Sequence, residues 1–332
     1  MTDRDRRRAA VPTRTLVLSA IDVNGKLDAG PLFAIAAAAG HSDKAMRDCL
    51  GRVVGEGILA HVEGRGRSAR YRMTDTGRAE LDADLGWTAF AHRVDAGLEP
   101  WDHNWRIIGL AIPERRRGAR DALRSLLVEF GAAPLQPGLY VHAYELDGFV
   151  HQLADHLGVS DGVAALATPA IRIGDVRRSE ELVARLWPLD ELAGRYESIE
   201  RRLTTIARQA PSTPADELAA SMFSAIVGME TVLRSDPLLP SELLPADWAG
   251  SRARQAFRVA HAAASAGSDL FNGSRVMQSF AAEIDRSLAE SSAEFWARWF
   301  PRLMQAYRTR LPPVATGRPS GVAGVQVVHS DG

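Results

Sequence analysis

Residues 42–73 read SDKAMRDCLGRVVGEGILAHVEGRGRSARYRM, and this stretch decides the fold of the N-terminal part of the chain. Ser42 is a favourable N-cap residue, so a helix is expected to begin just after it. The apolar residues that follow recur at helical spacing and predict one buried stripe: Met46, Cys49, Leu50, Val53 and Val54. The segments 58–63 and 68–73 then flank a glycine-containing turn at 64–67, which predicts a β-hairpin.

Three further helices are predicted around this stretch. Residues 13–24 and 30–39 precede it, the second with a proline in its first turn and a glycine just after its end. A helix over 74–93 follows the hairpin. The order helix, helix, helix, hairpin, helix predicts a winged helix-turn-helix domain over residues 1–93, in which the helix at 42–56 enters the major groove of DNA.

Seven residues of this predicted domain are candidates for contacting DNA. The buried stripe leaves polar side chains on the opposite face of the third helix, where Arg can bind guanine bidentately and Lys or Arg can hold a phosphate. The hairpin carries arginines beside glycines, as expected for a wing that follows phosphates or enters the minor groove. The candidates are Ser42, Lys44, Arg47, Asp48, Arg65, Arg67 and Arg70.

The distribution of charge favours a polyanion partner for the N-terminal part only. Residues 1–73 contain 13 Lys and Arg against 8 Asp and Glu, whereas the rest of the chain contains 27 against 33. A basic segment on an acidic body is typical of proteins that bind nucleic acid through that segment. The basic arm formed by Arg4, Arg6, Arg7 and Arg8 either contacts the DNA backbone or is a disordered start without a role.

Two more domains are predicted beyond a linker at 94–100. Residues 101–175 alternate apolar strands with helices in the order β-α-β-α-β, which is typical of a small ferredoxin-like α+β domain. The expected strands are 106–113, 138–144 and 162–173, and the expected helices are 114–130 and 148–158. Residues 179–310 are helical, with separate helices at 179–209, 217–236, 250–266 and 275–308. Residues 311–332 lack periodicity and predict a disordered tail.

The predicted fold class is therefore mixed α and α+β, with an N-terminal winged helix-turn-helix, a central ferredoxin-like domain and a C-terminal all-α domain. The single cysteine, Cys49, lies on the buried stripe and cannot form an intramolecular disulfide. No apolar run reaches the roughly 18 residues of a membrane span. The basic start lacks the apolar segment of a secretory signal. We therefore expect a cytoplasmic protein with no membrane partner.

The sequence offers little for catalysis. It contains no HExxH, GxGxxG or P-loop motif, and His151 and His156 are five residues apart, a spacing that does not favour a shared zinc ion. A nuclease built on the central domain would need a carboxylate near the end of its first strand, which reads Leu110-Ala111-Ile112-Pro113. We expect no catalytic residue, no metal and no cofactor. A metal-dependent nuclease is kept as the alternative.

Three stretches together resemble the PaaX family of transcriptional repressors. They are SDKAMRDCLGRVVGEGIL (42–59), WDHNWRIIGLAIPERRRGARDALRSLLVEFGAAPLQPGLYV (101–141) and DPLLPSELLPADWAGSRARQAF (236–257). The third is the most specific, and the similarity covers about residues 13–265. The chain departs from the family's W-D-G-x-W pattern, because His103 stands in place of its glycine.

The resemblance implies a repressor that leaves its operator when an aryl-CoA thioester, such as phenylacetyl-CoA, or another acyl-CoA binds. It also implies that the central domain is nuclease-like in fold but not catalytic. One winged helix reads only a few base pairs, so we expect a homodimer on a pseudo-palindromic site in double-stranded DNA. The pairing surface is expected after residue 94, in the helical segment or the central domain. The effector pocket is not identified by the sequence, and a DNA-binding scaffold without an effector is a third possibility.

Overall fold

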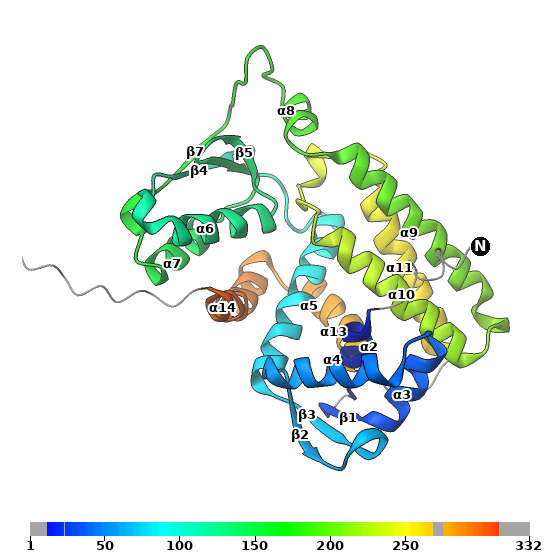
Figure 1. Ribbon diagram of the computed structural model, residues 1–332. Helices are drawn as coiled ribbons and strands as arrows, with labels where there is room; N and C mark the ends of the chain where they lie inside the picture. Colours follow the sequence, from blue (N-terminus) through cyan, green and yellow to red (C-terminus); the bar gives the residue numbers. More distant parts are fainter. Residues whose placement is uncertain (1–11, 23, 268–274, 312–332) are drawn as a thin grey trace, which may run out of the picture.

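The computed structural model describes residues 12–22, 24–267 and 275–311. Three groups of elements follow one another along the chain (Figure 1). The predicted basic arm, and the predicted tail after residue 311, lie outside the described residues. None of the helices within the described ranges combines the length and the apolar character that crossing a membrane requires.

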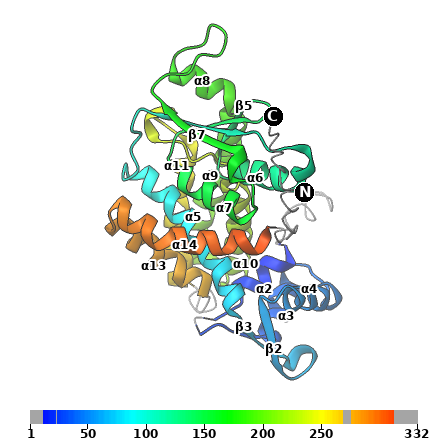
Figure 2. The same ribbon diagram turned by 90° about the vertical axis from the view of Figure 1, so that its left-hand side faces the viewer.

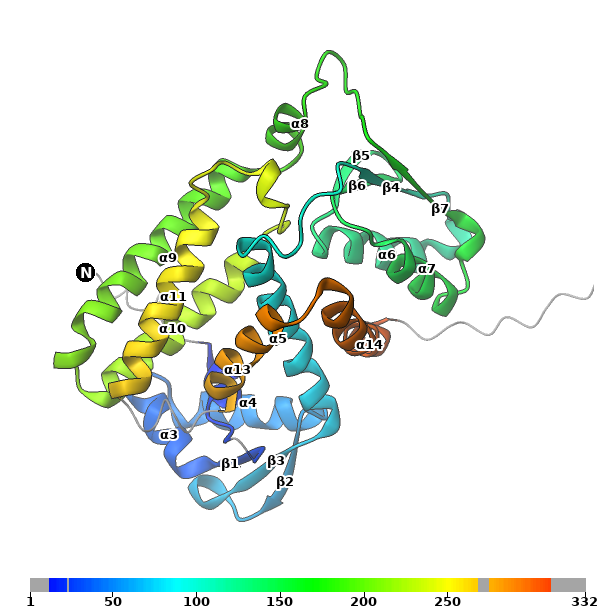
Figure 3. The same cartoon turned by 180° about the vertical axis from the view of Figure 1, so that it is seen from behind.

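The first group lies at one end of the molecule and contains a small sheet flanked by helices (Figures 1 and 3). Its elements are α2 (Thr13–Ser19), β1 (Lys26–Asp28), α3 (Ala29–Ala38), α4 (Asp43–Gly55), β2 (Leu59–Glu63), the 3₁₀ helix η1 (Gly66–Ser68), β3 (Arg70–Met73) and α5 (Asp75–Asp95). The antiparallel sheet has the strand order β1-β3-β2. Side chains cap both longer helices: Ser42 accepts a hydrogen bond from the Ala45 amide, and Thr74 accepts one from the Gly77 amide.

The prediction of a helix over 13–24 is wrong beyond Ser19, and strand β1 was missed. After α2 the Asp22 carboxylate accepts hydrogen bonds from the amides of Asn24 and Lys26, at 2.9 and 2.8 Å. An aspartate that bonds the backbone two to four residues onward forms a turn instead of continuing a helix. The turn leads into β1, which pairs with β3 and completes the sheet.

The second group forms a four-stranded antiparallel sheet with helices on one face. Its elements are β4 (Trp105–Leu110), the 3₁₀ helix η2 (Glu114–Arg116), α6 (Arg117–Glu129), β5 (Ala133–Gln136), β6 (Leu139–His142), α7 (Asp147–His156), the 3₁₀ helix η3 (Ser160–Gly162) and β7 (Val163–Thr168). The strand order is β5-β6-β4-β7, and the chain order is β-α-β-β-α-β. The helices α6 and α7 lie on the same side of this sheet (Figure 3).

Alternate residues of β4 face different cores, as the period of two in a strand requires. Ile108 and Leu110 belong to the core shared with α6 and α7. Trp105 and Ile107 face the opposite side, where they share a core with Trp187 of the helical part. The sheet is therefore covered on both faces, which explains why β4 reads as a nearly continuous apolar run.

Two strands in this region end at least three residues before the predicted position, and one strand was missed. β4 ends at Leu110 rather than at residue 113, and β7 ends at Thr168 rather than at residue 173. β5 was missed because Pro134 sits inside it. A proline has no backbone N–H to donate to a neighbouring strand. β5 is an edge strand, so the backbone groups on its outer side need no partner strand.

The third group is helical, and two predicted single helices are each divided in two. Its elements are α8 (Ser179–Leu186), α9 (Leu189–Gln209), the 3₁₀ helix η4 (Ala210–Ser212), α10 (Ala215–Leu233), the 3₁₀ helix η5 (Ser241–Leu243), α11 (Ala249–Gly267), α13 (Arg275–Ala289) and α14 (Ser292–Arg310). Pro188 separates α8 from α9 because its ring and missing amide hydrogen stop the preceding helix. Ser291 starts α14 anew through a reciprocal capping box with Glu294.

The last two helices return to the middle of the chain. α13 and α14 pack against α5, and α14 also contacts α7, whereas α9, α10 and α11 form a bundle beside them (Figures 2 and 3). One core joins residues of α2–α4 to the α9–α11 bundle, and a second joins α5 and the four-stranded sheet to α14. The domain boundaries 1–93, 101–175 and 179–310 stay predictions. Contacts across them are extensive.

His103 occupies a backbone conformation that glycine adopts more easily. Its φ angle is +61°, at the position where the resembled pattern has glycine. A side chain in the left-handed region costs about 1–2 kcal/mol relative to the right-handed one, and glycine avoids most of that cost. We expect His103→Gly to be at least as stable as the natural chain and His103→Ala to be less stable than His103→Gly by about 1 kcal/mol. Thermal unfolding of the three proteins checks this, and an alanine variant as stable as the glycine variant would contradict it.

Candidate DNA-binding surface and ligand cavity

Helix α4 presents a polar face to solvent opposite its apolar stripe. Met46, Cys49, Leu50 and Val53 are buried, while Lys44, Arg47 and Asp48 are exposed. This division follows from the helical repeat, because residues three and four apart share a face. Ser42 is also exposed, although its hydroxyl is used to cap the helix.

The β2–β3 hairpin carries the other three candidates, Arg65, Arg67 and Arg70, and all three are exposed. Its tip contains Gly64 and Gly66 at φ angles of +76° and +57°. A Cβ atom on Gly64 would lie 2.1 Å from the Ser68 carbonyl oxygen, so only glycine fits there. The tip is thus a tight turn that requires glycine, and it places the hairpin arginines at one end of the molecule.

Two of the hairpin arginines are already engaged by carboxylates. Arg67 lies 3.2 Å from Asp43 in the first turn of α4, which ties the hairpin to that helix. Arg70 lies 2.6 Å from Glu63 and 3.4 Å from Asp28. Exposed pairs of this kind contribute between about 0 and 1 kcal/mol, so a phosphate can displace the carboxylates at little cost.

Lys44, Arg47 and Arg65 form no ion pair with any residue that the structure describes. Their charges face solvent from α4 and from the hairpin tip. Cations that face solvent attract a polyanion over several ångströms, and the attraction falls as salt is added. These three side chains are therefore the strongest candidates for contact with a polyanion.

A buried cluster around Arg254 joins three parts of the chain that sequence analysis treated separately. Its guanidinium forms a bidentate pair with Asp95 at the end of α5, at 2.6 and 2.7 Å. It also reaches Asp236 at 3.4 Å, and Asp236 in turn accepts a 2.6 Å hydrogen bond from the Tyr196 hydroxyl. Arg254, Asp236 and Tyr196 are each at most 3 % exposed. The cluster fixes α5 against α9 and α11.

The two carboxylates of this cluster hold Arg254 in its charged form. Burial disfavours the charged form of Arg254, but the hydrogen bonds to Asp95 and the nearby acidic groups outweigh it and raise the pKa of the guanidinium. Burial and the neighbouring Asp236 raise the pKa of Tyr196 well above its usual value. Asp236 begins the quoted stretch 236–257, which also contains Arg254, so the cluster explains two residues of the most specific part of the resemblance.

A second buried pair fastens the C-terminal helices to α5. Arg93, which is fully buried, lies 2.7 Å from Glu99. The same guanidinium donates to the carbonyl oxygen of Glu290 at 2.8 Å and to that of Ser287, at the junction of α13 and α14. Neither pair was predicted, because a sequence does not show which of its 40 Lys and Arg are buried.

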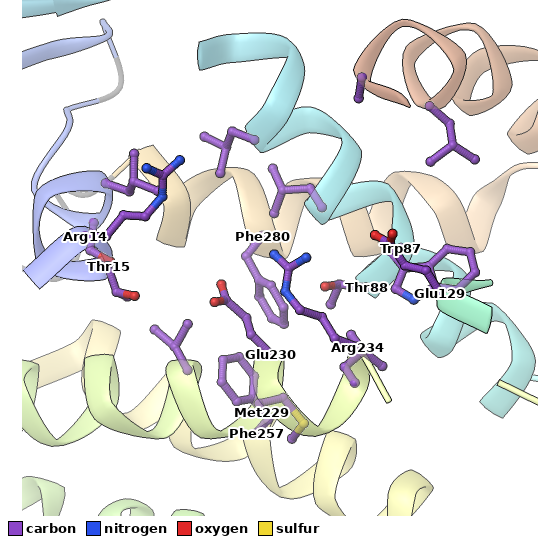
Figure 4. A pocket seen from close by; sticks show the side chains of 18 of the residues that line it. Arg14, Thr15, Trp87, Thr88, Glu129, Met229, Glu230, Arg234, Phe257 and Phe280 are labelled. Atoms are coloured by element: carbon purple, nitrogen blue, oxygen red, sulfur yellow. The ribbon is translucent and has the colours of Figure 1, made fainter. Parts of the chain in front are cut away.

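A cavity of about 210 Å³ lies where α2, α5, α10 and α14 meet (Figure 4). Aromatic side chains of Trp87, Phe257 and Phe280 contribute to its walls, and Arg14 lines it from α2. Glu230 of α10 and Arg234, which directly follows this helix, point into the same space (Figure 4). An apolar cavity with a few converging polar groups is the usual form of a small-molecule site.

A larger cavity of about 590 Å³ lies between the four-stranded sheet and α14. Two of its charged residues already have partners: Glu99 pairs with Arg93, and Asp102 pairs with Arg106. It does not touch α2, α3 or α4. Within the ranges that the structure describes, no group of three or more His, Cys, Asp and Glu side chains is arranged to hold a metal ion.

Comparison with known proteins identifies the family. Residues 98–180 match the PaaX protein central Cas2-like domain, and residues 187–274 match the PaaX-like protein C-terminal domain. The chain is 30 % identical over 244 residues to the transcriptional repressor PaaX of Escherichia coli (strain K12). The aligned region covers 70 % of this chain and 72 % of that protein. An uncharacterized protein, Rv0674 from Mycobacterium tuberculosis, has a solved structure with a TM-score of 0.43 and 23 % identity, covering 77 % of this chain and 89 % of that one.

The chain belongs to the PaaX family, as its sequence motifs predicted. A relative that is a transcriptional repressor agrees with the prediction of a regulator rather than an enzyme. The matched ranges include the whole of the stretches 101–141 and 236–257.

Proposed function

We propose that this chain is a DNA-binding transcriptional repressor that acts in the cytoplasm and uses residues 12–95 as a winged helix. The observation that carries the proposal is the exposed face of α4, where Lys44 and Arg47 form no ion pair with a described residue and lie beside a glycine-built hairpin that presents Arg65. The similarity to a transcriptional repressor supports it.

In this proposal α4 enters the major groove and the β2–β3 hairpin is the wing. Arg47 binds a base edge, Lys44 holds a phosphate, and Ser42 and Asp48 contact neighbouring groups. The Arg67–Asp43 pair joins the wing to the first turn of α4, and a DNA phosphate can take the place of the Asp43 carboxylate on Arg67. Arg65 and Arg70 then lie where the backbone of the DNA passes, and Arg65 can bind it without first giving up an ion pair to a described residue.

The proposal includes a homodimer on a pseudo-palindromic operator, with half-sites a whole number of roughly 10–10.5 base-pair turns apart. The pairing surface is placed after residue 94. A fragment without residues 1–93 would lose most of α5, which carries the core residues Ala89 and Phe90, so the test uses the full chain. Light scattering should give twice the chain mass of 36.0 kDa, and binding to a symmetric site should be lost when one half-site is deleted.

Selection of bound sequences from random double-stranded DNA tests the function itself. We expect enrichment of one symmetric motif, and competition by unrelated DNA should be weaker by roughly 10³-fold or more. A chain that binds all sequences equally, or binds none, would contradict repression at an operator.

An effector completes the proposal. Phenylacetyl-CoA and other acyl-CoA thioesters are the candidates, and they should release the chain from the selected operator. Thermal unfolding with each thioester measures binding, because a ligand at 100 times its Kd stabilises the folded state by about 2.7 kcal/mol. No stabilisation and no release by any thioester would favour a DNA-binding scaffold without this class of effector.

Arg65→Ala should weaken binding to all DNA sequences by about the same factor. The reason is that a wing arginine on a phosphate adds affinity without reading bases. The slope of log K against log salt should flatten by roughly 0.9, because one phosphate group is no longer neutralised by the protein. Fluorescence anisotropy at several salt concentrations measures both quantities. If only operator binding fell, at an unchanged salt slope, Arg65 would instead be reading bases.

A further inference from the structure

The cavity of about 590 Å³ between the four-stranded sheet and α14 has the size of a small-molecule site. Such sites range from about 300 to 1,000 Å³. One wall comes from residues between 143 and 149, where β6 leads into α7, and another comes from α14, which packs beside α7 (Figure 3). A dry cavity of about 150 Å³ accepts benzene, so this space has room for a ligand larger than a single ring.

Aromatic side chains form much of the wall of this cavity. They are Tyr144, Phe149, Trp296 and Phe300. The rings are held in place, because Phe149 and Phe300 pack edge to face with centroids 6.0 Å apart, and the Trp296 indole donates to Glu99 at 3.4 Å. The face of an aromatic ring carries a negative potential and attracts cations. This wall therefore favours a flat apolar body that carries a positive charge.

The charged residues that line the cavity leave one carboxylate without a counter-charge. Glu99 is paired with the buried Arg93, and Asp102 is paired with Arg106. Glu145 is exposed and forms no ion pair or hydrogen bond with a residue that the structure describes. Among the described residues that line the cavity, Arg106 is the only cation, and an anion would have to take it from Asp102. The uncompensated charge of the lining is therefore negative.

The surroundings of Tyr144 have the same sign. Burial raises the pKa of the Tyr144 hydroxyl, and the negative charges of Glu99, Glu242 and Asp236 raise it further. A negative charge is thus disfavoured at this point of the wall, so an anionic ligand would be repelled here and a cation attracted.

We propose that this cavity binds an organic amine in its protonated form, with an aromatic or other flat apolar body. The body lies against Tyr144, Trp296 and Phe300, and the ammonium group pairs with the carboxylate of Glu145. Ligands of this class are opposite in charge to the acyl-CoA thioesters that are the candidate effectors. The inference does not depend on DNA binding, because the cavity touches none of α2, α3 and α4.

The first experiment varies the charge of the ligand on one framework. The probes 1-naphthylmethylamine, 1-naphthalenemethanol and 1-naphthoate are titrated calorimetrically into the full chain near neutral pH. They share a two-ring body, and their charges are positive, zero and negative. We expect the amine to bind at least about tenfold more tightly than the alcohol, and the naphthoate to bind more weakly than the alcohol. Equal affinities for amine and alcohol, tighter binding of the naphthoate, or binding of none of the three overturns the inference.

The second experiment locates the binding. Ala297→Trp places a large side chain in the cavity from the exposed side of α14. The control is Ala184→Trp, the same substitution at an exposed alanine of α8 that does not line the cavity. Ala297→Trp should weaken binding of the amine by about tenfold or more, and Ala184→Trp should leave it unchanged within about twofold. If the two variants bind the amine equally, the amine does not occupy this cavity and the inference is wrong.

The third experiment tests the carboxylate. Glu145→Gln removes its charge and keeps its shape, and Glu181→Gln is the control because Glu181 is an exposed glutamate of α8 outside the cavity. In Glu145→Gln the preference for the amine over the alcohol should fall from about tenfold to about threefold or less, while the affinity for the alcohol stays the same. Glu181→Gln should keep the full preference. An undiminished preference in Glu145→Gln overturns the proposed role of Glu145. None of these measurements uses DNA, so their failure would leave the proposed function untouched.

Discussion

Replacing Arg254 with alanine is expected to destabilise the folded chain by about 3–5 kcal/mol. The substitution removes the only cation that the structure shows within hydrogen-bonding distance of both Asp95 and Asp236. Asp236 would stay buried, still accepting hydrogen bonds from Tyr196 and from the Leu238 amide, but without a counter-charge. Taking one partner from a buried ion pair leaves an uncompensated charge, which costs far more than the pair itself contributes. Chemical denaturation measures the free energy of unfolding.

Arg252→Ala is the matched control for this prediction. Arg252 is two residues away on the same helix and lies near three carboxylates, Asp247, Glu200 and Glu197, but its side chain is 34 % exposed. Solvent screens those pairs, so the loss of stability should be much smaller than for Arg254→Ala. Equal losses in the two variants would show that the burial of the Arg254 cluster does not determine its importance. We expect Asp95→Asn to lower the free energy of unfolding as well, because it removes the carboxylate that accepts both hydrogen bonds from Arg254.

Arg47→Ala is expected to weaken operator binding by about 1–3 kcal/mol, which is roughly 5- to 150-fold. The exposed position of Arg47 near the middle of α4, with no ion pair to any described residue, allows its guanidinium to reach a base edge. The effect should be larger on the operator than on unrelated DNA, and discrimination should relax at one base pair of each half-site. Binding isotherms on the operator and on single-base variants measure both effects.

Arg178→Ala is the control for Arg47→Ala. Arg178 is also an exposed arginine, with a side chain that is 73 % accessible, but it lies just before α8, at the opposite end of the molecule from α4 (Figures 1 and 3). Its loss should leave operator affinity unchanged within about twofold. If Arg47→Ala left both affinity and base preference unchanged, α4 would not be the helix that reads DNA.

Short-range patterns in the sequence determined most of the elements. The stripe from Met46 to Val53 predicted α4 and its exposed face, and the caps at Ser42 and Thr74 are formed as expected. The glycines at 64 and 66 marked the hairpin tip. These predictions succeed because helical periodicity, N-caps and tight turns depend on residues within a few positions of one another. The three family motifs could also be recognised from the sequence, because each is one continuous segment of the chain.

Elements that depend on a distant partner were missed. β1 exists because β3 lies beside it, and β5 tolerates Pro134 because it is the edge of a sheet. The break between α13 and α14 was also missed, because an apolar pattern can continue through a capped turn. In each case the deciding contact joins residues that the local pattern does not connect.

Only the tertiary structure decided the properties of the buried charges and of the cavity. The sequence shows Asp95, Tyr196, Asp236 and Arg254 as ordinary residues far apart along the chain, and folding brings them into one cluster. It likewise places Arg14 between a cavity and Glu56 of α4. Charge pairing and cavity shape depend on distances in space, and chain entropy allows distant segments to meet at little extra cost as loops lengthen. The sequence by itself therefore determined most of the elements and the family, whereas the packing determined which charges are buried and where the cavities lie.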